Sequence, residues 1–274
     1  MKQKFTWLIT ASVLTVTLTA LTLSSCNKDA TTQARTAAFN TDNANSNSNL
    51  VAWYTFNGDT KDHSGNGNNV DFNNNATSTA GKDGLPNTAY LFDGTSSYMT
   101  VPNSASLNPS SAITIIVVVQ PLGFYQGECH SNRVICKGYN DYDNGRYTIG
   151  YDDQPFWQYQ GCDQQVKEGK ETFYGAYGDG QATSAGVTDL AIHVKQGKWY
   201  TLAYTFDGRR SRFYVNGMLQ AASVISTTFT PNSNPLFIGR NQDPNFPYYF
   251  NGIIDEIRIY NTALSQNNIQ QLNP

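Results

Sequence analysis

The chain has 274 residues, a formal net charge of −3 and only 14% charged residues. This composition lacks the basic surface that nucleic-acid binding requires, so no nucleic-acid partner is expected. Aromatic residues make up 13% of the chain, with 17 Tyr and 14 Phe, which favours strands over helices. The part beyond residue 50 is long enough for one large β-sandwich with its own core.

The first 25 residues have the pattern of a signal peptide. Lys2 and Lys4 precede an apolar run over residues 7–23, which is short for a membrane-spanning helix. The Leu-Ser-Ser-Cys of residues 23–26 resembles the lipobox of bacterial lipoproteins. The resemblance implies cleavage before Cys26 and acylation of that residue. The alternative is an ordinary secretory signal followed by a chance cysteine.

The residues after the cysteine predict where the anchor leads. Asn-Lys-Asp at residues 27–29 resembles the surface-export signal of Bacteroidetes lipoproteins, although that signal usually contains more acidic residues. The resemblance implies a lipid anchor in the outer membrane of the cell envelope, with the folded part at the cell surface. Residues 26–49 have almost no large apolar groups, so this lipidated segment is predicted to be a disordered tether.

Residues 50–274 are predicted to form one β-domain. Residues 113–119 are a β-branched apolar run, typical of a strand buried on both faces. Within residues 199–219, two alternating runs with turns at Asp207-Gly208 and Asn216-Gly217 predict an antiparallel meander. A short helical turn is expected over residues 265–272. Further strands are predicted at residues 50–56, 89–92, 97–101 and 253–260, and a short one is predicted to begin at residues 70–72.

Several stretches, in a specific order, resemble the laminin G-like (LamG-like) domains of the concanavalin A-like lectin/glucanase superfamily. The resemblance implies an all-β, two-sheet antiparallel β-sandwich, the concanavalin A-like jelly roll. It implies no particular ligand, because this fold hosts lectins, adhesion domains, hydrolases and lyases. The matching stretches are residues 199–217 together with LVAWYTFNGD (50–59), DHSGNGNN (62–69), AYLFDG (89–94), YMTVPN (98–103), ICKG (135–138), FIGR (237–240) and GIIDEIRIYNTALS (252–265).

The polar loop at residues 57–69 is a candidate metal site. It is rich in glycine and in oxygen donors, and Ca²⁺ takes about six to eight oxygen ligands. The family resemblance implies a structural Ca²⁺ that links this loop to the last strand. Its expected ligands are Asp62 and Asp255, with Asp59 and Asn57 as alternates. The competing interpretation is a turn-rich loop in which Asp62 caps backbone amides.

The acidic residues of the last strand do not predict catalysis. A retaining glycosidase needs two carboxylates on one face, about 5–5.5 Å apart. Asp255 and Glu256 are adjacent, so we expect them on opposite faces, and residue 258 is Arg. His193 follows Ala-Ile and lacks the Gln of the motif found in alginate-type lyases. The chain is therefore not expected to be an enzyme, and a glycoside hydrolase or polysaccharide lyase is the less favoured alternative.

An aromatic-rich stretch at residues 124–177 is the expected ligand region. Aromatic rings stack on sugar faces while amides and carboxylates bind hydroxyl groups, and this stretch intersperses Tyr, Phe and Trp with Gln and Asp. The alternative is that Trp157 and Tyr159 pack into the core. A second aromatic group at residues 245–250 is expected on a loop rim. The predicted carbohydrate-binding residues are Trp157, Tyr159, Tyr142, Tyr139 and Gln158.

The sequence thus predicts a surface-anchored, lectin-like lipoprotein that captures a glycan or polysaccharide. The alternative is an adhesion domain with a protein partner. Three cysteines remain after the anchor, so an exported chain can form at most one intrachain disulfide. Cys136 is expected to be a small buried side chain, which leaves Cys129 and Cys162 as the preferred pair.

Overall fold

A computed structural model of the chain describes residues 49–127, 131–139, 143–152, 171–179, 187–225 and 227–273. These residues all belong to one compact unit, Phe39–Pro274. In the described part, no helix is long and apolar enough to cross a membrane. Several predictions fall outside the described residues: the signal peptide and tether, and the residues Cys26, Cys129, Tyr142, Trp157, Gln158, Tyr159 and Cys162.

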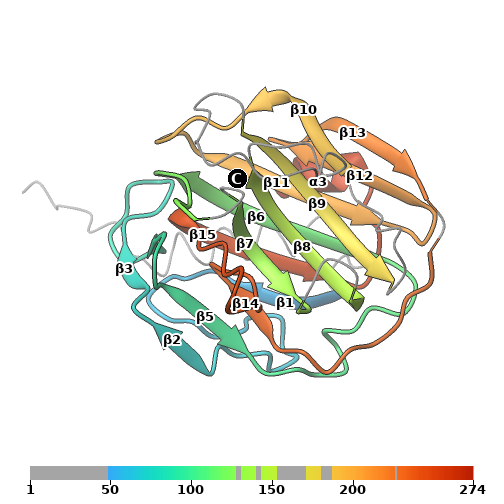
Figure 1. The fold of residues 1–274 in the computed structure, drawn as a ribbon, viewed down its shortest axis with the longest axis horizontal. Coiled ribbons are helices and arrows are strands. Elements are labelled where there is room, and N and C mark those ends of the chain that lie inside the picture. The colour runs from blue at the N-terminus through green and yellow to red at the C-terminus, as the bar shows by residue number, and fades with distance from the viewer. Residues whose placement is uncertain are drawn as a thin grey trace, which may run out of the picture. The chain divides into compact units, whose positions relative to one another are not determined.

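Two antiparallel sheets pack face to face (Figure 1). This arrangement confirms the predicted all-β, two-sheet antiparallel sandwich. The eight-stranded sheet contains, in order, β13 (Met218–Val224), β12 (Arg210–Val215), β11 (Tyr200–Phe206), β6 (Ile113–Pro121), β15 (Asn251–Tyr260), β4 (Ala89–Asp93) and β3 (Thr77–Thr79), and β1 (Leu50–Tyr54) also pairs with β15. The seven-stranded sheet contains, in order, β10 (Val187–His193), β9 (Thr172–Asp179), β8 (Asn144–Asp152), β7 (Asn132–Lys137), β14 (Leu236–Ile238), β5 (Tyr98–Val101) and β2 (Phe72–Asn74).

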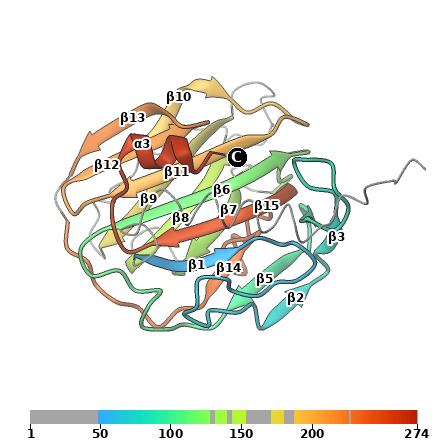
Figure 2. The same cartoon turned by 180° about the vertical axis from the view of Figure 1, so that it is seen from behind.

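Strand β6 is buried on both faces, as its continuous apolar run predicts. Ile115 and Val117 belong to the core between the two sheets. Ile116 belongs instead to a smaller apolar cluster on the outer face of the eight-stranded sheet. The short helix α3 (Gln266–Gln271) contributes Ile269 to that outer cluster and lies over β11 and β12 (Figure 2). A strand that is covered on both sides has no need for alternating polar residues.

The predicted meander is confirmed as β11, β12 and β13. Asp207 terminates β11 because its Oδ1 accepts hydrogen bonds from the backbone N–H groups of Arg209 and Arg210. Asn216 and Gly217 both have positive φ, at 50° and 77°, which a tight hairpin turn between β12 and β13 requires. Asp207 and Asn216 are therefore turn residues, and the meander supplies a rigid sheet.

The last strand differs from the expected alternation at one point. The pairing of β15 with β6 shifts register between Ile254 and Glu256, which marks a β-bulge at Asp255. Two residues, Asp255 and Glu256, consequently lie between the core residues Ile254 and Ile257. The extra residue interrupts the regular alternation of the strand at this point.

One lysine is buried inside the sandwich without a carboxylate beside it in the described part of the chain. Lys137 ends β7 and is fully buried, and its Nζ donates to Asn108 Oδ1 at 3.0 Å and to Asn232 Oδ1 at 2.5 Å. Burial lowers the pKa of Lys137 to about 8, because the charged form loses solvation.

Stability should therefore rise with pH between about 8 and 10.5, where the unfolded lysine is protonated and the folded one is neutral. Relative to Lys137→Met, the native chain should gain about 2 kcal/mol of unfolding free energy between pH 7 and pH 9.5. Urea unfolding at both pH values measures this gain. The variant is the control, because it retains every tyrosine that titrates at alkaline pH. An unchanged difference between the two proteins would refute the prediction.

Candidate ligand-binding site

The predicted metal loop is organised by one carboxylate. Asp62 Oδ1 accepts hydrogen bonds from the backbone N–H groups of Trp53 and Ser64, both at 2.9 Å. Its Oδ2 accepts from Ser64 Oγ and from the backbone N–H of Asn68, also at 2.9 Å. Asp62 thereby ties the loop to β1, which is the capping role that formed the alternative to metal binding.

The other predicted calcium ligands have separate partners. Asp59 Oδ1 accepts from Lys61 N at 3.1 Å and lies 3.2 Å from His63 Nε2, whereas Asp255 Oδ2 accepts from Lys82 N at 2.8 Å. Asn57 donates its backbone N–H to Thr55 Oγ1 at 3.5 Å. Across the described ranges, no three His, Cys, Asp or Glu side chains form a group that could hold a metal. Calcium binding stays a prediction, and backbone carbonyls would have to supply much of the coordination.

A continuous set of aromatic side chains lies on the outer face of the seven-stranded sheet. Phe72 on β2 and Phe237 on β14 both pair with Thr100 on β5, so the three share one face with Tyr98. The ring of Tyr98 lies between the other two aromatic rings, 5.8 Å from Phe72 and 5.9 Å from Phe237. The alternate residues Met99 and Ile238 point into the core.

The connection from β14 to β15 extends this row. Its Tyr249 ring lies 6.3 Å from Tyr125, and Tyr125 lies 6.1 Å from Tyr248. Tyr248 in turn lies 6.1 Å from Phe246. We call the whole set the aromatic band; it comprises Phe72, Tyr98, Phe237, Arg240, Tyr249, Tyr125, Tyr248 and Phe246.

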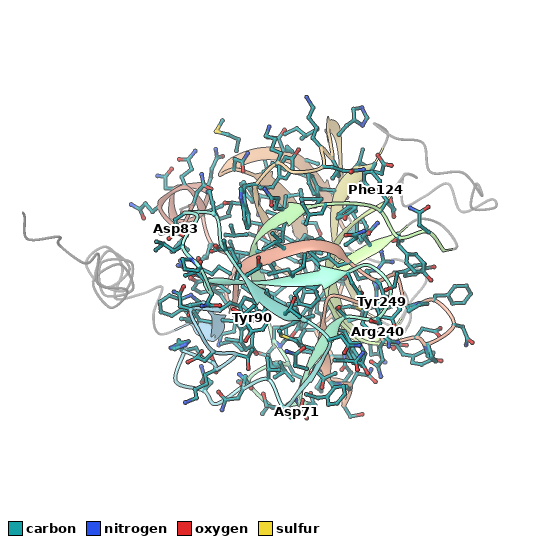
Figure 3. All side chains as sticks on the ribbon, turned by 90° about the vertical axis from the view of Figure 1, so that its left-hand side faces the viewer. Asp71, Asp83, Tyr90, Phe124, Arg240 and Tyr249 are labelled. Carbon is teal, nitrogen blue, oxygen red and sulfur yellow. The ribbon has the colours of Figure 1, made fainter. Side chains whose placement is uncertain are left out.

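Arg240 lies between the rings on strands β5 and β14 and a ring of the connection from β14 to β15. Its guanidinium carbon lies 4.9 Å from the ring centre of Tyr98 and 5.2 Å from that of Tyr249, with Phe237 at 5.5 Å. Figure 3 shows Arg240 and Tyr249 next to each other at the surface, away from Asp71. Cation–π attraction of this kind fixes the guanidinium among the rings.

Local hydrogen bonds hold the loop that carries Arg240 and Tyr249. Asn241 donates its backbone N–H to Pro247 O at 2.7 Å and its side-chain amide to Phe246 O at 3.1 Å. The backbone N–H of Arg133 on β7 donates to Tyr248 O at 2.9 Å. The loop is therefore closed on itself and attached to the sheet, and it carries the aromatic group expected at residues 245–250.

Of the five predicted sugar-binding residues, Tyr139 lies in the described part. It is 40% exposed, next to the same loop. Desolvation and the carboxylate of Asp243, which accepts its hydroxyl hydrogen bond, raise the pKa of Tyr139. Cys136 is buried and free, as predicted, and its Sγ donates to Asn241 Oδ1 at 3.3 Å.

Sequence reasoning missed Phe72, Tyr98, Phe237 and Arg240 as ligand candidates. Each lies in a short strand or motif that the sequence does identify, and the exposed face could be assigned from the buried neighbours Met99 and Ile238. The sequence could not show that residues 72, 98 and 237 become neighbours, because strand order in the sheet brings them together.

A second arginine, Arg133, contacts the aromatic band from its buried side at Tyr248. The guanidinium of Arg133 lies 4.9 Å from the ring centres of both Tyr174 and Tyr248, but Arg133 is only 1% exposed. Arg240, in contrast, is half-buried and reaches the surface. The outward-facing cation is therefore Arg240.

Structures of similar fold include binding domains and a domain of an enzyme. Domain 4 of AbnA, a GH43 extracellular arabinanase from Geobacillus stearothermophilus in complex with arabinotriose, matches 82% of this chain and 98% of its own length, with 21% identity and a TM-score of 0.56. The binding domain of Paraclostridial Mosquitocidal Protein 1 matches 82% of this chain, with 18% identity and a TM-score of 0.61. A structure of botulinum neurotoxin type C, whose cell entry depends on two ganglioside molecules, matches 84%, with 13% identity and a TM-score of 0.60.

The chain spans about half the length of the two toxin domains, 52% and 51%. Identities this low establish a shared fold and no shared ligand. No curated protein matches the chain. The model of the concanavalin A-like lectin/glucanases superfamily matches residues 93–270, which is more than half of the chain. The chain therefore belongs to the concanavalin A-like lectin/glucanases superfamily.

Proposed function

We propose that this protein binds carbohydrate through the aromatic band. The observation that carries the proposal is the row of rings on one exposed face, in which Phe72 is 49% and Phe246 is 38% exposed. Apolar rings of this size are seldom left at a surface without a partner, and sugars present apolar faces that stack on them. Related folds bind arabinotriose and interact with gangliosides, which is consistent with a saccharide ligand.

Binding is favoured over hydrolysis because the acidic residues of the last strand are committed to the fold. Glu256 accepts from Trp53 Nε1 and from Arg258, and Asp255 accepts from a backbone N–H. We therefore propose a binding module and not an enzyme. Release of reducing sugar from a polysaccharide panel, abolished by Glu256→Gln, would favour a glycoside hydrolase.

A protein ligand is the second candidate. A domain of the same fold, from botulinum neurotoxin DC, forms a complex with rat synaptotagmin II. Capture of a defined protein that added sugars do not displace would favour this role.

The lipobox-like sequence at Cys26 supports attachment to the outer membrane through a lipid anchor. Labelling with [³H]palmitate that Cys26→Ser abolishes would test that anchor.

Substituting rings of the aromatic band should weaken glycan binding without unfolding the protein. We expect Phe72→Ala and Tyr249→Ala each to reduce affinity for the best polysaccharide about three- to tenfold, because one stacked ring is lost. Affinity electrophoresis of the purified chain measures this loss. Leu219→Ala is the matched control, because Leu219 is 44% exposed on the other sheet. Equal losses in all three variants, or none, would reject the aromatic band as the binding surface.

A further inference from the structure

We propose that the ligand is an anionic sugar, whose carboxylate or sulfate group is bound by Arg240. This inference rests on the proposed carbohydrate-binding function and specifies its ligand class. It starts from the bonding of Arg240, a side chain at the centre of the aromatic band.

The guanidinium of Arg240 retains free hydrogen-bonding capacity at its outer end. Its Nε donates to Asn241 O at 2.6 Å, while its two terminal nitrogens donate to Tyr249 Oη and Gln242 O, each at 3.4 Å. A guanidinium has five N–H groups. These three bonds therefore leave one N–H on each terminal nitrogen for a ligand, and a guanidinium that donates from both terminal nitrogens can bind a carboxylate.

Arg240 forms no ion pair with the residues that the structure describes. All three of its acceptors are neutral oxygens. Asp243 lies in the same loop, but its Oδ1 accepts from Asn245 N and its carboxylate also accepts from the Tyr139 hydroxyl. Asp71 precedes Phe72 at the β2 end of the aromatic band, and its carboxylate accepts a hydrogen bond from Thr100 Oγ1 at 2.8 Å.

The surrounding rings strengthen the binding of an anion by the Arg240 guanidinium. Tyr98, Phe237 and Tyr249 hold the guanidinium in place, so little side-chain entropy is lost when an anion binds. The rings also exclude water from its sides, which strengthens a charge-assisted hydrogen bond. Phe72 and Tyr125 extend the row in either direction, where adjoining sugar residues of the same chain can stack.

The test compares acidic polysaccharides with their own neutral forms. Purified chain is titrated with polygalacturonate, alginate and hyaluronate, each paired with its carboxyl-reduced derivative, and with chondroitin sulfate paired with its desulfated form. We expect about tenfold tighter binding of the acidic member, which weakens as salt is raised. The carboxyl-reduced pairs report a carboxylate ligand, and the desulfated pair reports a sulfate ligand.

Substitutions then assign the preference to one side chain. Arg240→Gln should remove the tenfold preference, because it weakens binding of the acidic form more than binding of the neutral form, and Arg240→Lys should retain part of the preference. Arg209→Gln is the matched control, because Arg209 is exposed in the turn between β11 and β12 of the other sheet. If Arg240→Gln does not fold, the Lys variant and the salt dependence still decide.

Three results would count against the inference, and they are distinguishable. Equal binding of acidic and neutral forms would overturn it while leaving carbohydrate binding intact. An acidic preference that survives Arg240→Gln would move the anion to another site. Failure to bind any polysaccharide would reject the proposed function together with the inference.

Discussion

Replacing Asp62 with alanine should lower the unfolding free energy by about 3 kcal/mol, a large loss for one polar substitution. Its carboxylate accepts four hydrogen bonds, three of them from backbone N–H groups. Alanine leaves these donors without their acceptor and releases the loop from β1. For a domain of this size the melting temperature should fall by about 6–12 °C, which thermal unfolding by circular dichroism measures.

Asp71→Ala supplies the control for this experiment. Asp71 is exposed, and its side chain accepts a hydrogen bond from Thr100 Oγ1 at 2.8 Å. A surface substitution of this kind should change the unfolding free energy by no more than about 0.5 kcal/mol. If both variants lose the same stability, Asp62 does not organise its loop.

The native protein and the Asp62→Ala variant also test the predicted calcium site. A metal that binds only the folded chain stabilises it by mass action, so chelation with EDTA should then lower the melting temperature of the native protein. Asp62→Ala should be insensitive to EDTA in that case. If Asp62 acts only as an acceptor for N–H and O–H groups, EDTA leaves both melting temperatures unchanged and the calcium prediction is wrong.

Replacing Glu256 with alanine should destabilise the protein by about 3–5 kcal/mol, because it breaks a buried ion pair. Glu256 Oε1 lies 2.6 Å from a terminal nitrogen of Arg258 and accepts from Trp53 Nε1 at 2.5 Å. All three residues are less than 10% exposed. Burial alone would lower the pKa of Arg258, but the neighbouring carboxylate outweighs it and raises that pKa. Arginine stays protonated in proteins even without such a partner, so truncation leaves a buried charge uncompensated.

A double substitution separates the net contribution of the ion pair from the cost of leaving one buried charge unpaired. Glu256→Leu together with Arg258→Met should recover most of the lost stability, because apolar groups can replace a buried ion pair at little cost. Urea unfolding of Glu256→Leu, Arg258→Met and the double variant measures the coupling energy between the two side chains. A Glu256→Ala variant that loses less than about 1 kcal/mol would show that the pair contributes nothing net.

The local rules succeeded where neighbouring residues decide the structure. The turns at Asp207-Gly208 and Asn216-Gly217, the buried strand β6 and the short helix α3 all follow from patterns within a few residues. The bulge at Asp255 was not predictable, since its cause is the pairing of β15 with β6. Asp62 was predicted only in part. The sequence of its loop suggests either capping or metal binding, and the structure shows the four hydrogen-bond donors that its carboxylate contacts.

The sequence alone determined the all-β class and the meander, since each depends on the order of nearby residues. Tertiary structure decided where ligand-binding groups gather. Phe72, Tyr98 and Phe237 are far apart in the chain, and they form one surface because β2, β5 and β14 pair side by side. Arg240 joins them because its loop folds back onto the sheet beside Tyr249. A stacking surface needs side chains from several strands to share one face, and strand order, which local patterns do not encode, brings them there.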